Sequence, residues 1–202
     1  MAASLVTAFL KTEAHMDTPD IQFHIQPFSA DSPAAGAHKF SAFTASVLQM
    51  RPESAGHLKL KSADMDDHPY IHPNYLATDT DQRTIVKGIQ IARKIAQFEP
   101  LKSHIIEEHA PGAGVAMDDY DATLDWARRT SVTIYHPTGT CKMGPKTDKM
   151  AVVDARLRVH GINGLRVADC SIMPQIVSGN TNAPAIMIGE KVSDMILEDA
   201  RA

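Results

Sequence analysis

The sequence predicts an α+β fold in which an antiparallel sheet is flanked by helices. Three observations predict it: residues 21–27 alternate apolar and polar side chains, residues 81–98 carry an apolar stripe at helical spacing, and a second such stripe lies near the C-terminus. No internal repeat or low-complexity tract interrupts this order. With 44% hydrophobic and 22% charged residues, the 202-residue chain has the composition of an ordinary globular protein.

The first strand is expected at residues 21–27. Its apolar side chains, Ile21, Phe23 and Ile25, recur with a period of two and therefore share one face of the strand. His24 is then expected on the opposite face.

Further strands are expected on both sides of a turn. After a loop at residues 31–36, residues 40–50 are apolar and β-prone. Residues 51–56 are typical of a turn into a second strand at 57–62, and we expect these two segments to pair antiparallel. Two prolines within residues 64–75 favour an extended or looping path there.

Two helices follow. Asp81 is the expected N-cap of the first, which runs to about Phe98. Its predicted stripe is Ile85, Ile89, Ala92 and Ala96. Acidic residues at 118–121 suit the N-terminus of a second, shorter helix. Its predicted apolar residues are Leu124, Trp126 and Ala127.

The C-terminal part is expected to hold two short strands and a helix. Residues 151–153 and 165–167 are the strands, and they frame a glycine-bearing turn at 160–164. Pro184 suits the first turn of the last helix, where a missing N–H is not needed. The predicted buried stripe is Ile188, Val192, Met195 and Ile196.

Charge and cysteine content exclude several functional classes. The net charge of −4, without a long basic run, argues against nucleic-acid binding. Cys141 and Cys170 lie 29 residues apart with no CxxC pair, which favours a reducing compartment, so the cytoplasm is expected. No stretch of about 18 apolar residues could span a membrane, and the N-terminus lacks the basic start of a signal peptide.

Two segments carry residues that could take part in catalysis or binding. His136 lies at the edge of a glycine-bearing turn, and because imidazole titrates near neutral pH it could act as a general base. A structural turn histidine is the alternative interpretation. Asn180 lies just before the last helix, where unpaired N–H groups favour an anion or an electron-rich ring. An ordinary asparagine cap is the alternative there.

Other candidate sites are weaker. Pro69 and Pro73 prevent the helix that would bring His68 and His72 together on a zinc ion, so no metal site is predicted. Cys141 lies near basic residues but within no complete nucleophile pattern. A small structural cysteine is the preferred interpretation.

Three motifs together resemble the C-terminal part of a glucose–methanol–choline (GMC) flavin oxidoreductase, in its choline and alcohol dehydrogenase branch. They are YHPTGTCKMG at residues 135–144, VVDARLRVHGINGLRVADCSIMP at 152–174 and GNTNAPAIMIGEKVSD at 179–194. Weaker support comes from RPESAGHLKLKSAD at 51–64. The resemblance implies FAD as cofactor and an alcohol as substrate, which is oxidised to a carbonyl by hydride transfer to the flavin.

The resemblance also assigns residues. It implies that His136 assists removal of the hydroxyl proton and that Asn180 hydrogen-bonds the alcohol oxygen. Counting back ten residues from Glu190 selects Asn180 rather than Asn182 for that role. The flavin is implied to lie against Asp169, Cys170, Asn182, Ala183 and Pro184.

The chain departs from the family in one respect, since no GxGxxG turn for the FAD pyrophosphate occurs in it. We therefore expect a substrate-binding domain at residues 1–134. Residues 135–202 are expected to hold the catalytic segment and to complete an FAD-binding domain that is otherwise missing from this chain. The FAD-binding half would come from the same protein or another chain, and exposed apolar faces make self-association possible. A non-catalytic binding module without FAD is the alternative function.

Overall fold

The structure is a computed structural model that describes residues 4, 6–32 and 35–201. The chain forms two compact units. The first combines Met1–Ala55 with Asn74–Val132, and the second combines Gly56–Pro73 with Thr133–Ala202. Each unit has its own secondary structure and is described separately.

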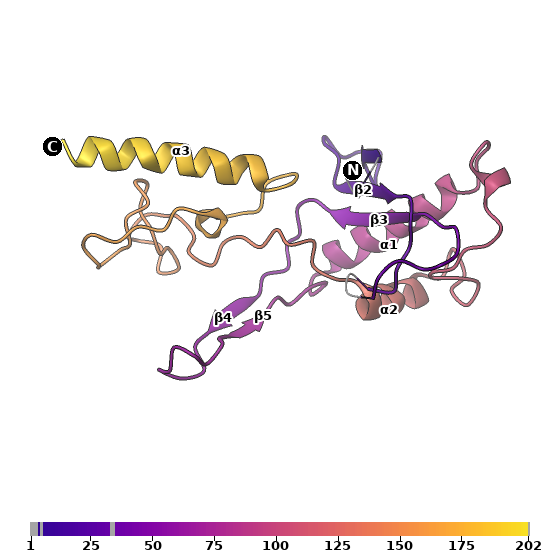
Figure 1. The fold of residues 1–202 in the computed structure, drawn as a ribbon, viewed down its shortest axis with the longest axis horizontal. Coiled ribbons are helices and arrows are strands. Elements are labelled where there is room, and N and C mark those ends of the chain that lie inside the picture. Colours follow the sequence, from indigo (N-terminus) through magenta and orange to yellow (C-terminus); the bar gives the residue numbers. More distant parts are fainter. Residues whose placement is uncertain (1–3, 5, 33–34, 202) are drawn as a thin grey trace. The chain divides into compact units, whose positions relative to one another are not determined.

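A three-stranded antiparallel sheet forms the centre of the first unit (Figure 1). Its order is β1 (Val6–Leu10), β2 (Ile21–Gln26), β3 (Thr44–Gln49). The strand predicted at residues 21–27 is confirmed, and Ile21 and Phe23 are buried as expected. Gln22 is buried too, so the middle strand is covered on both faces. Strand β1 was not predicted from the sequence.

The predicted pairing of residues 40–50 with 57–62 is wrong. Strand β3 pairs with β2, whereas β4 (His57–Lys59) pairs with β5 (Tyr70–His72) in a separate two-stranded sheet of the second unit. The backbone N–H groups of Glu53 and Ser54 donate to the Asp81 carboxylate, at 2.9 and 2.8 Å. Because these bonds direct the chain to a helix start, residues 51–56 do not close a hairpin.

Helix α1 (Asp79–Ile95) packs on β3 and β2, and on helix α2 (Tyr120–Thr130). The two predicted helices are thus confirmed, but Thr78, not Asp81, is the N-cap of α1. Asp81 points its carboxylate at residues 49–54 instead. At Gly88 of α1 a Cβ would lie 2.4 Å from Val47 Cγ1, so the absence of a side chain permits close packing on the sheet. Buried apolar residues of this helix pair are Ile85, Val86, Ile89, Leu124 and Ala127.

The second unit holds the long helix α3 (Asn182–Asp199), which ends beside the C-terminus (Figure 1). The strands predicted at residues 151–153 and 165–167 are not formed. Only isolated bridges occur there, such as Val153 with Val159 and Arg158 with Arg166. The turn between them is confirmed. Short 3-10 helices lie at Lys102–His104 in the first unit and Cys170–Ile172 in the second.

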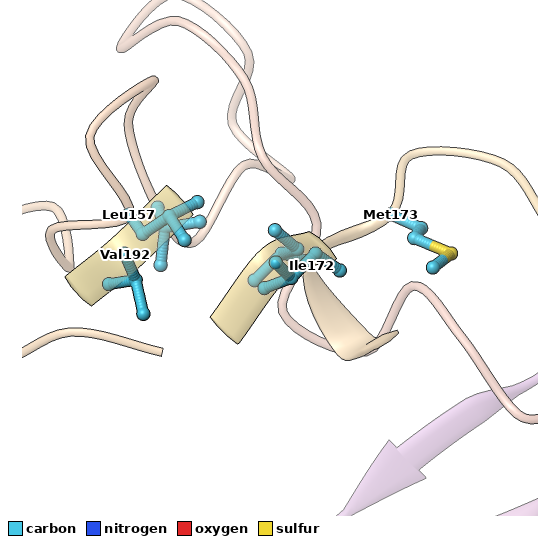
Figure 2. Close-up of a cluster of buried hydrophobic side chains, with 6 residues drawn as sticks. Leu157, Ile172, Met173 and Val192 are labelled. Atoms are coloured by element: carbon cyan, nitrogen blue, oxygen red, sulfur yellow. The ribbon is translucent and has the colours of Figure 1, made fainter. Parts of the chain in front are cut away.

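A compact apolar cluster holds α3 against the loops of the second unit (Figure 2). Its buried members are Val153, Leu157, Ile172, Met173, Ile188 and Val192. The expected burial of Ile188 and Val192 is confirmed, whereas Ile196 is 49% exposed. Its exposure shows that the apolar stripe of α3 is wider than the cluster that covers it.

Ion pairs fix the C-terminal end of α3. Asp199 accepts hydrogen bonds from the guanidinium groups of Arg156, Arg158 and Arg166. Hydrogen bonding from Arg158, with further contributions from Arg166 and Arg156, lowers the pKa of Asp199 to about 2 against a smaller opposing effect of desolvation. Across the described part of the chain, no helix is both long and apolar enough to cross a membrane.

Candidate active site

A fixed stretch of backbone supports the loop that carries His136. The N–H groups of Cys141 and Met143 donate to the carbonyls of Ser171 and Ile172, at 2.9 and 2.7 Å, and the Gly144 N–H donates to Val153 at 3.0 Å. Residues 141–144 are thereby held between two other segments of the same unit. The loop that carries His136 leads directly into these residues, so its C-terminal end is fixed in position.

The backbone immediately before His136 is in an unusual conformation. Tyr135 has a φ of 62°, in the left-handed region that a residue with a side chain adopts only at a cost of about 1–2 kcal/mol. Its N–H donates to the Thr133 hydroxyl at 3.0 Å, which supports this conformation. Such strain is often found where a functional side chain must point in one particular direction.

The structure brings His136 and Asn180 together. Asn180 Nδ2 lies 2.9 Å from His136 Nε2, although the two residues are 44 positions apart. On the other side of the ring, His136 Nδ1 lies 2.7 Å from the Thr181 hydroxyl oxygen. Both ring nitrogens thus have partners from the segment that leads into α3.

Thr181 is a site residue that the sequence analysis missed. It is the N-cap of α3 and only 7% exposed, yet its side chain makes no capping bond to the helix. Threonine at this position normally accepts a hydrogen bond from a backbone N–H of the first turn. Here the hydroxyl is directed at His136 instead. An N-cap residue type directly after Asn180 was the available signal. The asparagine cap considered for Asn180 is not formed.

These contacts match one tautomer of the imidazole. Because an amide nitrogen only donates, Nε2 is the acceptor in this arrangement, and Nδ1–H is the donor to the Thr181 hydroxyl. His136 is half-buried and Asn180 is exposed, so the basic nitrogen and the amide can both be reached from outside the unit.

The residues expected along the flavin divide into two groups. Asp169 and Cys170 make local contacts: the Asp169 carboxylate accepts from the Ser171 N–H at 2.8 Å, and Cys170 Sγ lies 3.8 Å from the Thr181 carbonyl oxygen. The remaining three, Asn182, Ala183 and Pro184, form the first turn of α3. Because that helix has no side-chain capping hydrogen bond, its first N–H groups stay available to a ligand at the N-terminal end of the helix.

The basic neighbour of Cys141 is engaged in an ion pair. The Lys142 ammonium group pairs with Asp148 at 2.7 Å, and hydrogen bonding from Lys142 lowers the pKa of that carboxyl group. The Cys141 N–H is used in the supporting backbone described above. A structural cysteine remains the preferred interpretation.

Comparison with known proteins decides the family. The family model described as GMC oxidoreductase matches residues 52–189, which include His136 and Asn180. The chain belongs to this family. It is 42% identical over 189 residues to the mitochondrial choline dehydrogenase of Mus musculus and 43% identical to an oxygen-dependent choline dehydrogenase of Klebsiella pneumoniae. These matches cover 93% of this chain but 31% and 33% of the relatives, so the chain spans about a third of their length.

Solved structures of other GMC enzymes have a similar fold. Pyridoxine 4-oxidase from Mesorbium loti superimposes with a TM-score of 0.81 and 28% identity, over 95% of this chain and 37% of that one. A formate oxidase superimposes with a TM-score of 0.77 and 30% identity, over 91% of this chain and 32% of that one. The expectation from the three sequence motifs is therefore confirmed at the level of the family.

Proposed function

We propose that the chain is the catalytic and substrate-binding portion of an FAD-dependent oxidoreductase that oxidises the CH–OH group of an alcohol to a carbonyl. The observation that carries this proposal is the contact of His136 Nε2 with Asn180 Nδ2 at 2.9 Å. It puts a basic ring nitrogen beside a hydrogen-bond donor, which are the two groups that alcohol deprotonation needs.

In the proposed reaction, the substrate hydroxyl takes the place of the direct hydrogen bond between the two groups. Because Nε2 has a single lone pair, the 2.9 Å contact with Nδ2 opens when the hydroxyl oxygen enters and contacts both nitrogens at roughly 3 Å. His136 Nε2 accepts the hydroxyl proton, and Asn180 Nδ2 donates to the oxygen while negative charge develops on it. Thr181 holds the ring by accepting a hydrogen bond from Nδ1–H, so that the imidazolium formed remains hydrogen-bonded.

FAD, when bound, supplies the acceptor for the carbon-bound hydrogen, which leaves as hydride. The residues of this chain fit that cofactor at the first turn of α3, formed by Asn182, Ala183 and Pro184. Its uncapped N–H groups and the positive end of the helix dipole favour an electron-rich ring. Asp169 and Cys170 act from the adjoining turn, whose shape their hydrogen bonds maintain.

We assign residues 1–134 to substrate binding and residues 135–202 to catalysis and to an FAD-binding domain completed by an N-terminal half, in the same protein or a partner chain. The surface of α3 supports a missing partner. Its large side chains Ile186, Met187, Ile196 and Leu197 are each about half exposed. Apolar residues in such density on one helix are typical of a face that another segment covers. Self-association through this face is the outcome when that half is absent.

The substrate class is an alcohol, and choline is the first to test because the curated relatives named above are choline dehydrogenases. The cytoplasm is proposed as the compartment because both cysteines are free, as in a reducing environment.

The test is anaerobic reduction of the flavin in the parent protein, meaning this chain together with its FAD-binding half in one polypeptide or two, with choline and a panel of primary alcohols. His136→Ala is expected to lower the rate of flavin reduction by roughly 10²–10⁴, the usual contribution of a positioned base. His104→Ala, at an exposed histidine of the first unit, is the matched control and is expected to slow flavin reduction far less than His136→Ala does. Unchanged flavin reduction in His136→Ala would remove this residue from the mechanism. A parent protein that takes up no FAD would favour the non-catalytic binding module.

A further inference from the structure

A second group of potential ligands lies in the first unit. Among the described residues, Asp31, His38 and His109 form one group whose ligand atoms all lie within 4.8 Å of one another. The Asp31 carboxylate oxygen is 3.1 Å from His38 Nε2. Two ligands bound to a tetrahedral zinc ion, each about 2.0 Å from it, lie roughly 3.3 Å apart. The Asp31–His38 distance is thus already close to that of a coordinated pair.

His38 is held in the orientation that a metal ligand requires. Its Nδ1 lies 2.8 Å from the Ser29 hydroxyl oxygen, and its backbone N–H donates to the Ser29 carbonyl, also at 2.8 Å. The ring of Phe40 stacks on the imidazole at a centroid distance of 4.7 Å. A hydrogen bond to one ring nitrogen, which leaves the other for the metal, is the usual support of a coordinating histidine.

His109 comes from a distant segment that is anchored separately. The adjacent Glu108 pairs with Arg93 of α1 at 2.8 Å, and the same guanidinium group donates to the Val115 carbonyl at 2.8 Å. The His109 ring meets that of His38 edge-on, with centroids 5.1 Å apart. Since Glu108 is occupied by Arg93, it does not compete with His109 for a cation.

We propose that Asp31, His38 and His109 bind one divalent transition-metal ion, with zinc as the best match. Two imidazoles and one carboxylate are a ligand set that zinc accepts, and water completes the coordination in such three-ligand sites. The ion would connect the loop closed by Ser29 and His38 to the segment anchored on Arg93. This site is separate from the proposed alcohol chemistry. The sequence analysis predicted no metal site, because nothing in the sequence shows that residues 71 positions apart meet.

The test is a zinc titration of this chain, produced without a polyhistidine tag, in competition with a chromophoric chelator. One zinc ion per chain is expected. Replacing a ligand, in His38→Ala or His109→Ala, is expected to weaken binding by about 100-fold, and Ser29→Ala, which removes the support of His38, by about 10-fold. Circular dichroism of each variant shows whether the fold is retained.

The control is a second pair of histidines. His57 and His72 face each other across β4 and β5, with ring centroids 5.2 Å apart, and could hold zinc by themselves. The double variant His57→Ala/His72→Ala is expected to bind zinc as the unchanged chain does. X-ray absorption of the zinc-loaded unchanged chain should show two imidazoles, which tests the proposal without any variant. Loss of zinc in the His57/His72 variant, an absorption spectrum without two imidazoles, or no stoichiometric binding would each overturn the proposal.

Discussion

The two units of the chain are stabilised in different ways. The first has a three-stranded sheet with a helix pair packed on it, and its buried residues come from regular secondary structure. The second has isolated bridges, turns and one long helix held by an apolar cluster and by ion pairs at Asp199. The His136–Asn180 pair lies in the second unit. The proposed chemistry thus belongs to irregular backbone whose shape depends on individual side chains, as is common for functional loops.

The largest effect that distinguishes the two units is expected at Asp81 of the first unit. The carboxylate is 1% exposed and accepts hydrogen bonds from Gln49, Glu53 and Ser54. Although burial raises its pKa, the hydrogen bonds, with that of Ser54 the largest, outweigh burial and lower it.

Asp81→Ala leaves several buried donors without a partner and is expected to lower the free energy of unfolding by about 3 kcal/mol. The fluorescence of Trp126, which packs against the core of this unit, reports the loss. Asp79→Ala, in the same helical turn but exposed, is the matched control and should cost less than about 1 kcal/mol. Equal losses in both variants would show that Asp81 does not tie the helix start to residues 49–54.

A smaller effect is expected at Thr181 in the second unit. Thr181→Val keeps the shape of the side chain but removes the acceptor of the His136 Nδ1 proton. We expect flavin reduction in the parent protein to slow by about tenfold, since one hydrogen bond to a charged group contributes roughly 1.5 kcal/mol. The ¹⁵N signals of the imidazole should show a mixture of tautomers. Thr181→Ser retains the hydroxyl and should restore both. A valine variant with unchanged ¹⁵N signals would contradict this role.

The smallest expected effect is a loss of stability of helix α3 at low pH. The pKa of Asp199 in the folded chain is about 2, below its ordinary value of 3.8. A lowered pKa contributes stability that is present above the ordinary value and is lost as the pH falls towards the lowered one. The protection of α3 amides against hydrogen exchange, corrected for the intrinsic dependence of exchange on pH, should therefore fall between about pH 4 and pH 2. Asp199→Asn removes this dependence on pH. An identical acid profile in both proteins would exclude Asp199 as the anchor of α3.

Local features of the fold were predictable from the sequence, and non-local ones were not. Helices α1 and α2 and strand β2 follow from the spacing of their own apolar residues. The partner of β3 does not, because the bonds from Glu53 and Ser54 to Asp81 depend on a contact across more than 25 positions. The bridges around Val153 were predicted as strands because short apolar runs give the same signal in either case.

The site shows the same division. His136 and Asn180 were identified by family resemblance. The residues alone favoured a structural turn histidine at His136 and a helix cap at least as strongly as a functional role at Asn180. Two features could not be predicted without the folded structure. They are the contact between His136 and Asn180, and the absence of a capping hydrogen bond from the Thr181 side chain. The contact of His38 with His109 depends on two separately anchored segments, which no local pattern encodes.

The central claim is that the imidazole and the amide act on one substrate oxygen. A double-mutant cycle on anaerobic flavin reduction in the parent protein, that is, this chain with its FAD-binding half, tests it directly, with His136→Ala, Asn180→Ala and the double variant. Groups that act as a unit give strongly non-additive losses, so the double variant should be about as slow as His136→Ala alone while FAD stays bound. Losses that multiply independently, or loss of flavin from Asn180→Ala, would contradict the account.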